Sequence, residues 1–133
     1  MKAEKTLAVL MMATAVGLLA FWTLFFTVGL APENAPPCYR AFEHSFPLPD
    51  ILLAMVLFFA GRGLLAGKPR GRDLALFCAG AIMFLGVLDF SFNIQNGMYS
   101  LGIGEAVGNA CINVWCVGFG LALVLKLGRG AKE

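Results

Sequence analysis

Hydrophobic and polar positions follow one another along the chain in long blocks. Four stretches are uncharged or nearly so, at about 6–30, 49–67, 74–96 and 105–126. As a helix rising about 1.5 Å per residue, a stretch of roughly 20 residues crosses a hydrocarbon core of about 30 Å. Transmembrane strands would instead show segments of about ten residues with alternating hydrophobicity. The pattern therefore predicts an all-α fold, an integral membrane four-helix bundle that forms a single transmembrane domain over 1–133.

The segment between the first two stretches, 31–48, is less regular. A single helix over 38–66 would be about 42 Å long, which is too long to cross a membrane without a kink. Pro47 and Pro49 interrupt such a helix, and Pro49 suits the first turn of the helix that follows. We therefore expect a short helix or a re-entrant turn in this connector, bent at the prolines into the second span.

The charged residues are distributed unequally between the two sides of the predicted bundle. The chain has 10 basic and 8 acidic residues, for a net charge of +2. All the basic residues except Arg40 fall at the two chain ends or near the turn between the second and third spans. The positive-inside rule then predicts that both termini are cytoplasmic, in the plasma (inner) membrane if the source is a prokaryote. The basic turn at 67–73 is interpreted as a segment that sets the orientation of the spans in the membrane. The alternative is that it binds lipid headgroups or a protein.

The composition excludes several classes of function. Hydrophobic residues make up 59% of the chain and charged residues 14%, with a mean hydropathy of +0.81. Soluble domains are about 45–50% apolar and about 25% charged. Disorder, nucleic-acid binding and an ordinary soluble enzyme are therefore excluded, and the predicted partner is the lipid bilayer. The sequence has no Walker loop, Cys-x-x-Cys or His pair, so we expect no cofactor and no metal. A Cys38–Cys111 disulfide is compatible with the sequence, which leaves it open.

Five acidic residues fall in the predicted outer half. Asp50 and Glu105 lie at helix starts, where a carboxylate complements the helix dipole and its unpaired N–H groups. Glu33 lies in a proline-rich connector, where it is solvated. Glu43 and Asp89 have no such local explanation. They are the candidate catalytic residues, because two neighbouring carboxyl groups supply acid–base chemistry.

Asp89 lies within the outer third of the membrane, about 22 Å along a helix from Leu74. A carboxylate at this depth is costly unless it faces the bundle interior and finds partners. Asn93 and Asn96 follow at helical spacing and are expected to share its face. The alternative to a functional role is a buried structural hydrogen-bond network.

The fourth span carries a polar stripe on one face. Glu105, Asn109, Asn113 and Cys116 recur at spacings of four, four and three residues. Such side chains either join helices by hydrogen bonds or line a pocket. Trp115 falls on a neighbouring face, where it is a core residue, a lipid-facing residue or a lid over a pocket. The predicted ligand-binding residues are His44, Asn93, Asn96, Glu105, Asn109, Asn113 and Trp115.

The segment 43–49 reads Glu-His-Ser-Phe-Pro-Leu-Pro and resembles the EXPERA group, which includes sterol isomerases and the sigma-2 receptor. The resemblance implies four spans, cytoplasmic termini and an interior pocket for hydrophobic, often cationic, ligands. It also implies that Glu43 and Asp89 are the pocket acids, with Asn113 and Trp115 in its wall.

Three classes of function remain. The leading hypothesis is an outward-facing polar pocket that binds a small apolar or amphipathic molecule or lipid, with isomerase-like chemistry as an extension; whether the chain is an enzyme stays undecided. The alternatives are a small transporter or channel acting as a homo-oligomer, and a structural or assembly subunit without a pocket. Three pairs of small residues at four-residue spacing suit helix contacts, either within the bundle or between copies of the chain. These pairs are Ala13 with Gly17, Gly104 with Gly108, and Gly118 with Ala122.

Overall fold

The computed structural model describes residues 2–128, which are all-helical with no strand. Four helices are long and apolar enough to cross a membrane, which confirms the prediction of an all-α fold with four spanning helices. Such helices are compatible with a multi-pass membrane protein. The elements in chain order are α1 (Lys2–Leu24) and its π-helical extension η1 (Phe25–Gly29), α2 (Tyr39–Glu43), α3 (Pro47–Leu65), α4 (Pro69–Gln95), the 3₁₀ turn η2 (Met98–Ser100) and α5 (Ile103–Leu127).

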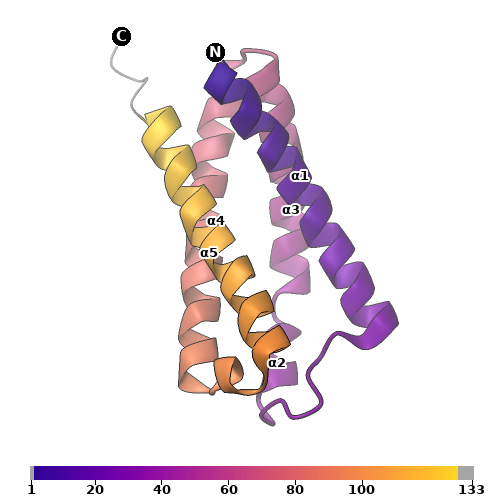
Figure 1. Ribbon diagram of the computed structural model, residues 1–133. Coiled ribbons are helices and arrows are strands. Elements are labelled where there is room, and N and C mark those ends of the chain that lie inside the picture. The colour runs from indigo at the N-terminus through magenta and orange to yellow at the C-terminus, as the bar shows by residue number, and fades with distance from the viewer. Residues whose placement is uncertain (1, 129–133) are drawn as a thin grey trace.

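The helices pack in the order α1, α3, α4 and α5, each mainly against its neighbour in that series (Figure 1). We call the end with the start of α1, the α3–α4 turn and the end of α5 the basic end. The opposite end, with α2 and η2, is called the connector end. The first and last members of the series, α1 and α5, scarcely touch, and they diverge toward the connector end (Figure 1). We call the side between α1 and α5 the open side; side chains of both helices still join the main core there, and Trp115 of α5 donates to Thr14 of α1.

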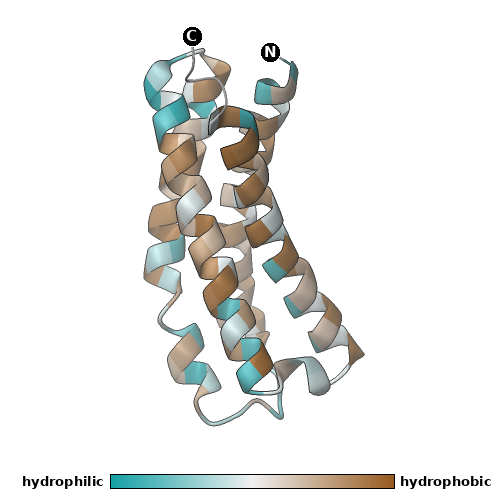
Figure 2. Cartoon of the chain, turned by 90° about the vertical axis from the view of Figure 1, so that its left-hand side faces the viewer, coloured by the Kyte–Doolittle hydropathy of each residue, from teal (hydrophilic) through white to brown (hydrophobic). Residues whose placement is uncertain are grey.

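The outer surface of the bundle is apolar. Hydrophobic residues cover most of the length of the spanning helices, and hydrophilic residues gather near the two ends (Figure 2). Large hydrophobic side chains such as Val16, Phe84 and Val114 are more than half exposed, at 61%, 69% and 62%. Such a surface suits a surrounding of lipid, because lipid chains are as apolar as these side chains.

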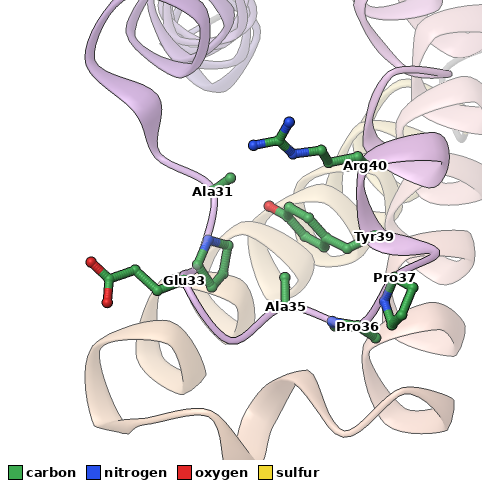
Figure 3. Close-up of a pocket in the computed structure, with 8 residues that line it drawn as sticks. Ala31, Glu33, Ala35, Pro36, Pro37, Tyr39 and Arg40 are labelled. Atoms are coloured by element: carbon green, nitrogen blue, oxygen red, sulfur yellow. The ribbon is translucent and has the colours of Figure 1, made fainter.

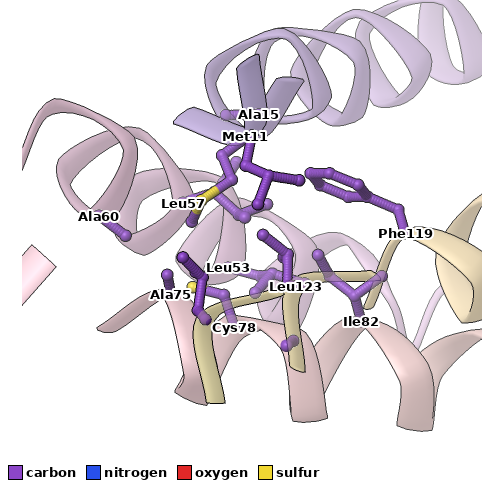
Figure 4. Packing of buried hydrophobic residues seen from close by; sticks show 14 residues of the cluster. Met11, Ala15, Leu53, Leu57, Ala60, Ala75, Cys78, Ile82, Phe119 and Leu123 are labelled. Carbon is purple, nitrogen blue, oxygen red and sulfur yellow. The ribbon is translucent and has the colours of Figure 1, made fainter. Parts of the chain in front are cut away.

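The main core lies between the helices from the basic end to the middle of the bundle. Met11 of α1, Leu57 of α3 and Leu123 of α5 are fully buried in it, beside Ile82 of α4 (Figure 4). All four spanning helices therefore contribute to one continuous apolar cluster.

Glycines let the helix backbones approach closely in this half. A Cβ atom on Gly61 would lie 2.8 Å from the Ala8 carbonyl oxygen, and one on Gly120 would lie 2.8 Å from that of Ala79. A Cβ atom on Gly71 would collide with the backbone of Gly63. Close backbone contact is how membrane helices gain van der Waals energy when lipid supplies no hydrophobic drive.

The predicted small-residue pairs are not used in this way. Around Gly17, Gly104, Gly108 and Gly118, an added Cβ atom would meet nothing within 4 Å. These pairs therefore make no close helix contact inside the bundle.

A second apolar cluster closes the connector end. It joins Trp22 and Phe25 at the end of the first span to Tyr39 of α2 and Met98 of η2. Gly97, with φ +66°, makes the turn between α4 and η2 in the left-handed conformation that glycine adopts without strain. The connector thus packs against the ends of the first and third spans, and α2 is a short helix where the sequence predicts a short helix or a re-entrant turn.

Candidate functional site

Three carboxyl groups come together inside the connector half of the bundle. Glu43 lies at the end of α2, Asp50 in the first turn of α3 and Asp89 two turns before the end of α4. Each of the three lies near enough to the other two for their negative charges to interact. We call these residues the acid cluster. Arg40 lies on the same short helix as Glu43, but it is exposed.

Asp50 is the most buried member of the acid cluster. Its side chain is 6% exposed, and its Oδ2 atom accepts a hydrogen bond of 2.8 Å from the indole Nε1 of Trp22. Its Oδ1 atom is buried and has no hydrogen-bond partner. The position in the first helical turn favours a carboxylate, but the indole N–H of α1 supplies the direct contact.

Asp89 is held by two asparagines. Asn93, one turn further along α4, donates to Asp89 Oδ2 at 3.1 Å. The amide of Asn113 on α5 lies within hydrogen-bonding reach of the same carboxylate and also donates to the hydroxyl of Tyr99 at 2.8 Å. Asn113 is fully buried, and its Oδ1 atom has no partner. Two buried acceptors, one on α3 and one on α5, are thus without a donor.

Two further polar groups border the acid cluster. Tyr39 lies near the charges of Glu43, Glu105 and Asp89, and the thiol of Cys116 lies near those of Asp50 and Asp89. Within residues 2–128, no three His, Cys, Asp or Glu side chains are arranged to hold a metal ion. The arrangement offers acceptors and negative charge, so a proton or a hydrogen-bond-donating head group is the chemistry it complements.

Four of the predicted site residues belong to the acid cluster or bond to it, namely Glu43, Asp89, Asn93 and Asn113. Glu105 lies near Tyr39, and Asn109 is half-buried one turn before Asn113.

Three predicted residues have other surroundings. His44 is exposed and lies edge-on to the rings of Phe25 and Phe26. Asn96 is the C-cap of α4, and its side chain donates to the backbone carbonyl of Phe92 and accepts from the Cys38 thiol. Trp115 is 43% exposed, stacks on Phe119 and donates to Thr14 Oγ1 at 3.2 Å. Cys38 and Cys111 are both free thiols.

Sequence reasoning missed Asp50, Trp22 and Tyr99 as parts of the site. The helix-start position of Asp50 was a sufficient local explanation for an acid there. A signal lay in Trp22, because a buried indole N–H needs an acceptor and its own span offers no acidic side chain. The sequence alone does not reveal that this acceptor lies on the next span.

Two hollows lie at the connector half, and the acid cluster lines neither. One, of about 360 Å³, lies within the connector and is lined by residues between 31 and 40; Tyr39 and Arg40 border it, and Glu33 points away (Figure 3). The other, of about 520 Å³, is an apolar groove along the α3–α4 seam. The predicted polar pocket around Glu43 and Asp89 is not one of these two hollows.

Comparisons of the chain with protein-family models, with curated proteins and with solved structures find no match. The resemblance to the EXPERA group therefore stays a prediction that rests on 43–49 and on the four spans.

Proposed function

We propose that this chain is a multi-pass membrane protein that binds a small amphipathic molecule, whose hydrogen-bond-donating head is held by the acid cluster. The observation that carries the proposal is the pair of buried oxygen atoms, Asp50 Oδ1 and Asn113 Oδ1, that have no donor. Buried polar groups in proteins nearly always have a partner, and an unsatisfied one marks a place where a partner is missing.

The chemistry of the head group follows from the groups around it. Trp22, Asn93 and Asn113 each donate a hydrogen bond near the acid cluster, while its three carboxyl groups together offer six acceptor oxygens. An isolated carboxylate inside a membrane is costly, and a donor that also carries positive charge offsets both the lost hydrogen bond and the lost solvation. A primary or secondary ammonium group meets both needs, and its apolar remainder suits the surroundings.

Access to the acid cluster is proposed from the open side between α1 and α5. These helices scarcely touch, and the hydrogen bond from Trp115 to Thr14 joins them. Opening this side would let the head group reach Asp89 and Asn113. In the proposed orientation the basic end faces the cytoplasm, and the acid cluster therefore lies in the outer half of the plasma (inner) membrane.

Binding is favoured over conduction by the difference between the two ends. A conducting path needs polar groups along its whole length. The half toward the basic end is filled by the apolar cluster around Leu57 and Leu123, so a path through one chain would be closed. A transporter would then need a homo-oligomer with the path between copies.

Proton transfer is an extension of the binding proposal. Glu43 and Asp89 are the two carboxyl groups that would act as an acid–base pair on a bound molecule. In that case Asp89→Asn would abolish turnover while the protein still folds, whereas unchanged turnover would exclude this role for Asp89.

The binding proposal is tested with dodecylamine as the probe. In a Trp115→Phe background, Trp22 is the remaining tryptophan, and it contacts Asp50. We expect dodecylamine to change Trp22 fluorescence saturably in nanodiscs. Dodecyltrimethylammonium, which has the charge but no N–H group, should bind at least tenfold more weakly.

The Asp89→Asn variant removes a charge and leaves the Trp22–Asp50 contact in place, so it should weaken dodecylamine binding at least tenfold. Glu33→Gln is the matched control, because Glu33 is an exposed acid on the connector. The proposal fails if both probes give the same non-saturating response with the Trp115→Phe protein and with its Asp89→Asn and Glu33→Gln variants, which would indicate partitioning into the bilayer alone.

A further inference from the structure

The hollow within the connector, which we call the connector hollow, carries polar groups that the acid cluster does not use. Its volume is about 360 Å³, and its lining residues fall between 31 and 40. Ligand pockets typically have volumes of about 300–1,000 Å³, whereas one water molecule occupies roughly 30 Å³. The connector hollow is therefore large enough for a polar group such as a phosphate.

Prolines hold the wall of the connector hollow in shape. The rings of Pro32, Pro36 and Pro37, which all line it, fix the φ angles of these residues. The backbone N–H of Ala35 donates to the Pro32 carbonyl oxygen at 3.3 Å. The backbone N–H of Tyr39 donates to the Pro36 carbonyl oxygen at 2.9 Å. A site whose shape is fixed in advance loses less conformational freedom when a ligand binds.

Tyr39 presents an unpaired hydroxyl group to the connector hollow. The residue is only 7% exposed, and its ring belongs to the second apolar cluster with Trp22 and Met98. No residue of the described range 2–128 forms a hydrogen bond with its hydroxyl group, which points into the connector hollow (Figure 3). A buried tyrosine hydroxyl usually has a hydrogen-bond partner, so we expect the partner of this one to be a group that enters the hollow.

Arg40 supplies the positive charge of the connector hollow. Its guanidinium group and the Tyr39 hydroxyl are directed to the same side of the hollow, whereas the Glu33 carboxylate points away (Figure 3). Every other basic residue of the chain falls at the two chain ends or near the α3–α4 turn. Guanidinium N–H groups and a phenol O–H group are both donors, and Arg binds phosphate oxygens with charge-assisted hydrogen bonds. The pair therefore complements a phosphate.

The connector hollow lies at the level of the lipid head groups. It lies between η1, which ends the first span, and α3. Hydrophilic residues gather near this end of the bundle, beyond the apolar length of the spanning helices (Figure 2). Because head groups flank a hydrocarbon core of about 30 Å, a segment that joins two spans lies beside them. Lipid phosphates are therefore the phosphates nearest to the hollow.

Neighbouring acids decide which kind of head group fits. Glu43, Glu105 and Asp89 lie near enough to Tyr39 for their negative charges to act there. These charges repel a head group that is only anionic, but they attract a cation carried by the same head group. A zwitterionic head group, with a phosphodiester for Arg40 and Tyr39 and a cationic amine beside it, meets both conditions.

We propose that the connector hollow is a binding site for the phosphodiester group of a zwitterionic phospholipid. Arg40 and Tyr39 donate hydrogen bonds to the phosphate oxygens, and the cationic amine lies on the side of the acids. The acyl chains lie along the apolar surface of the spanning helices. This site does not depend on the function proposed for the acid cluster, because no member of that cluster lines the hollow.

The test is native mass spectrometry of the protein released from nanodiscs that contain equal amounts of dioleoyl phosphatidylcholine and dioleoyl phosphatidylglycerol. The two lipids have the same acyl chains and the same phosphodiester, but only phosphatidylcholine carries a cation. We expect the protein to retain at least threefold more phosphatidylcholine than phosphatidylglycerol. Inorganic phosphate, added to the nanodiscs in excess, should not displace the bound lipid.

Two substitutions in the connector hollow should remove the preference. Arg40→Gln takes away the charge at an exposed position and should bring retention of phosphatidylcholine down to that of phosphatidylglycerol. Tyr39→Phe keeps the ring in its apolar cluster, removes the hydroxyl group and should lower the preference at least twofold. Arg62→Gln is the matched control, because it removes an exposed arginine at the basic end, and it should change nothing.

Equal or greater retention of phosphatidylglycerol by the unchanged protein would overturn the proposal, and so would a preference for phosphatidylcholine that survives both Arg40→Gln and Tyr39→Phe. Displacement of the lipid by inorganic phosphate would assign the connector hollow to a free phosphate ion and would also overturn it. None of these outcomes involves dodecylamine or Asp89, so failure here is distinguishable from failure of the proposed function.

Discussion

The two halves of the bundle are built from the same four helices but differ in how closely the helices pack and in how polar the interior is. Toward the basic end, backbones touch through glycines such as Gly71, and the interior is a continuous apolar cluster around Leu57. Toward the connector end, α1 and α5 diverge, and the interior holds three carboxyl groups with two unpaired acceptors. Most close glycine contacts therefore lie in the basic half, and a further one lies at Gly86, where an added Cβ atom would be 2.8 Å from the Cys116 Cβ atom.

This difference between the two halves has a physical reason. In lipid, helix association depends on van der Waals contact and interhelical hydrogen bonds, since the surroundings are as apolar as the core. The glycine contacts of the basic half supply the first of these. Because those contacts stabilise the fold, the connector half can keep two buried acceptors, Asp50 Oδ1 and Asn113 Oδ1, without donors. The comparison predicts that substitutions in the two halves have different effects.

The largest effect is expected from Gly71→Ala in the basic half. The added Cβ atom would collide with the backbone of Gly63 and Leu64, which cannot move aside as a flexible side chain would. Overpacking of this kind costs about 1–3 kcal/mol, and contact with a backbone places this variant at the upper end. Reversible unfolding in mixed micelles measures the loss.

Gly80→Ala on the same helix is the matched control, because its Cβ atom would meet nothing within 4 Å. Alanine is the better helix former by about 1 kcal/mol, so this variant should be neutral or slightly stabilised. Equal loss of stability in the two variants would mean that helix contact at Gly71 does not govern the packing of the basic half.

The helices could be predicted from the sequence, and most of the site could not. Long apolar stretches reveal spans because every backbone polar group in lipid must be satisfied within a helix. The face shared by Asp89 and Asn93 also follows from helical spacing, and the structure joins them by a hydrogen bond. The partners of Asn96 could not be predicted, because its side chain bonds to the Phe92 carbonyl and to Cys38 at the end of α4.

The contacts between spans could not be predicted from the sequence. Trp22 and Asp50 are 28 residues apart, and only the packing of α1 on α3 brings them together. Tyr99 likewise reaches Asn113 through the turn at Gly97. Sequence patterns identify which polar residues need partners in a membrane, but the partner depends on how the helices pack.

An intermediate effect is expected from Trp22→Phe in the connector half. The variant keeps an aromatic ring but removes the N–H group that Asp50 Oδ2 accepts, which leaves both oxygens of a buried carboxyl group without a donor. The loss of unfolding free energy should be about 2 kcal/mol, in the range for an unsatisfied buried acceptor.

Adding Asp50→Leu to Trp22→Phe should restore part of that stability, because replacing both partners of a buried hydrogen bond with apolar groups is nearly neutral. A double variant less stable than Trp22→Phe would show that Asp50 has a further stabilising partner. The same double variant should bind dodecylamine more weakly by isothermal titration calorimetry, which is needed here because the Trp22 reporter is absent; this result would connect Asp50 to binding.

The smallest effect is expected where α1 meets α5. Thr14→Val removes the acceptor of the Trp115 indole N–H with little change in volume, and interhelical hydrogen bonds in membranes contribute about 0.6 kcal/mol on average. Because Trp115 is 43% exposed and stacks on Phe119, it keeps its aromatic contact when the bond is lost. We therefore expect a stability change close to the limit of measurement, together with faster dodecylamine association, since this bond joins α1 to α5. Association is measured by surface plasmon resonance in the protein that keeps Trp115, because the Trp115→Phe background already lacks the bond. Trp115→Phe should reproduce both results, and the two substitutions combined should add nothing. A slower association rate would place access to the acid cluster elsewhere.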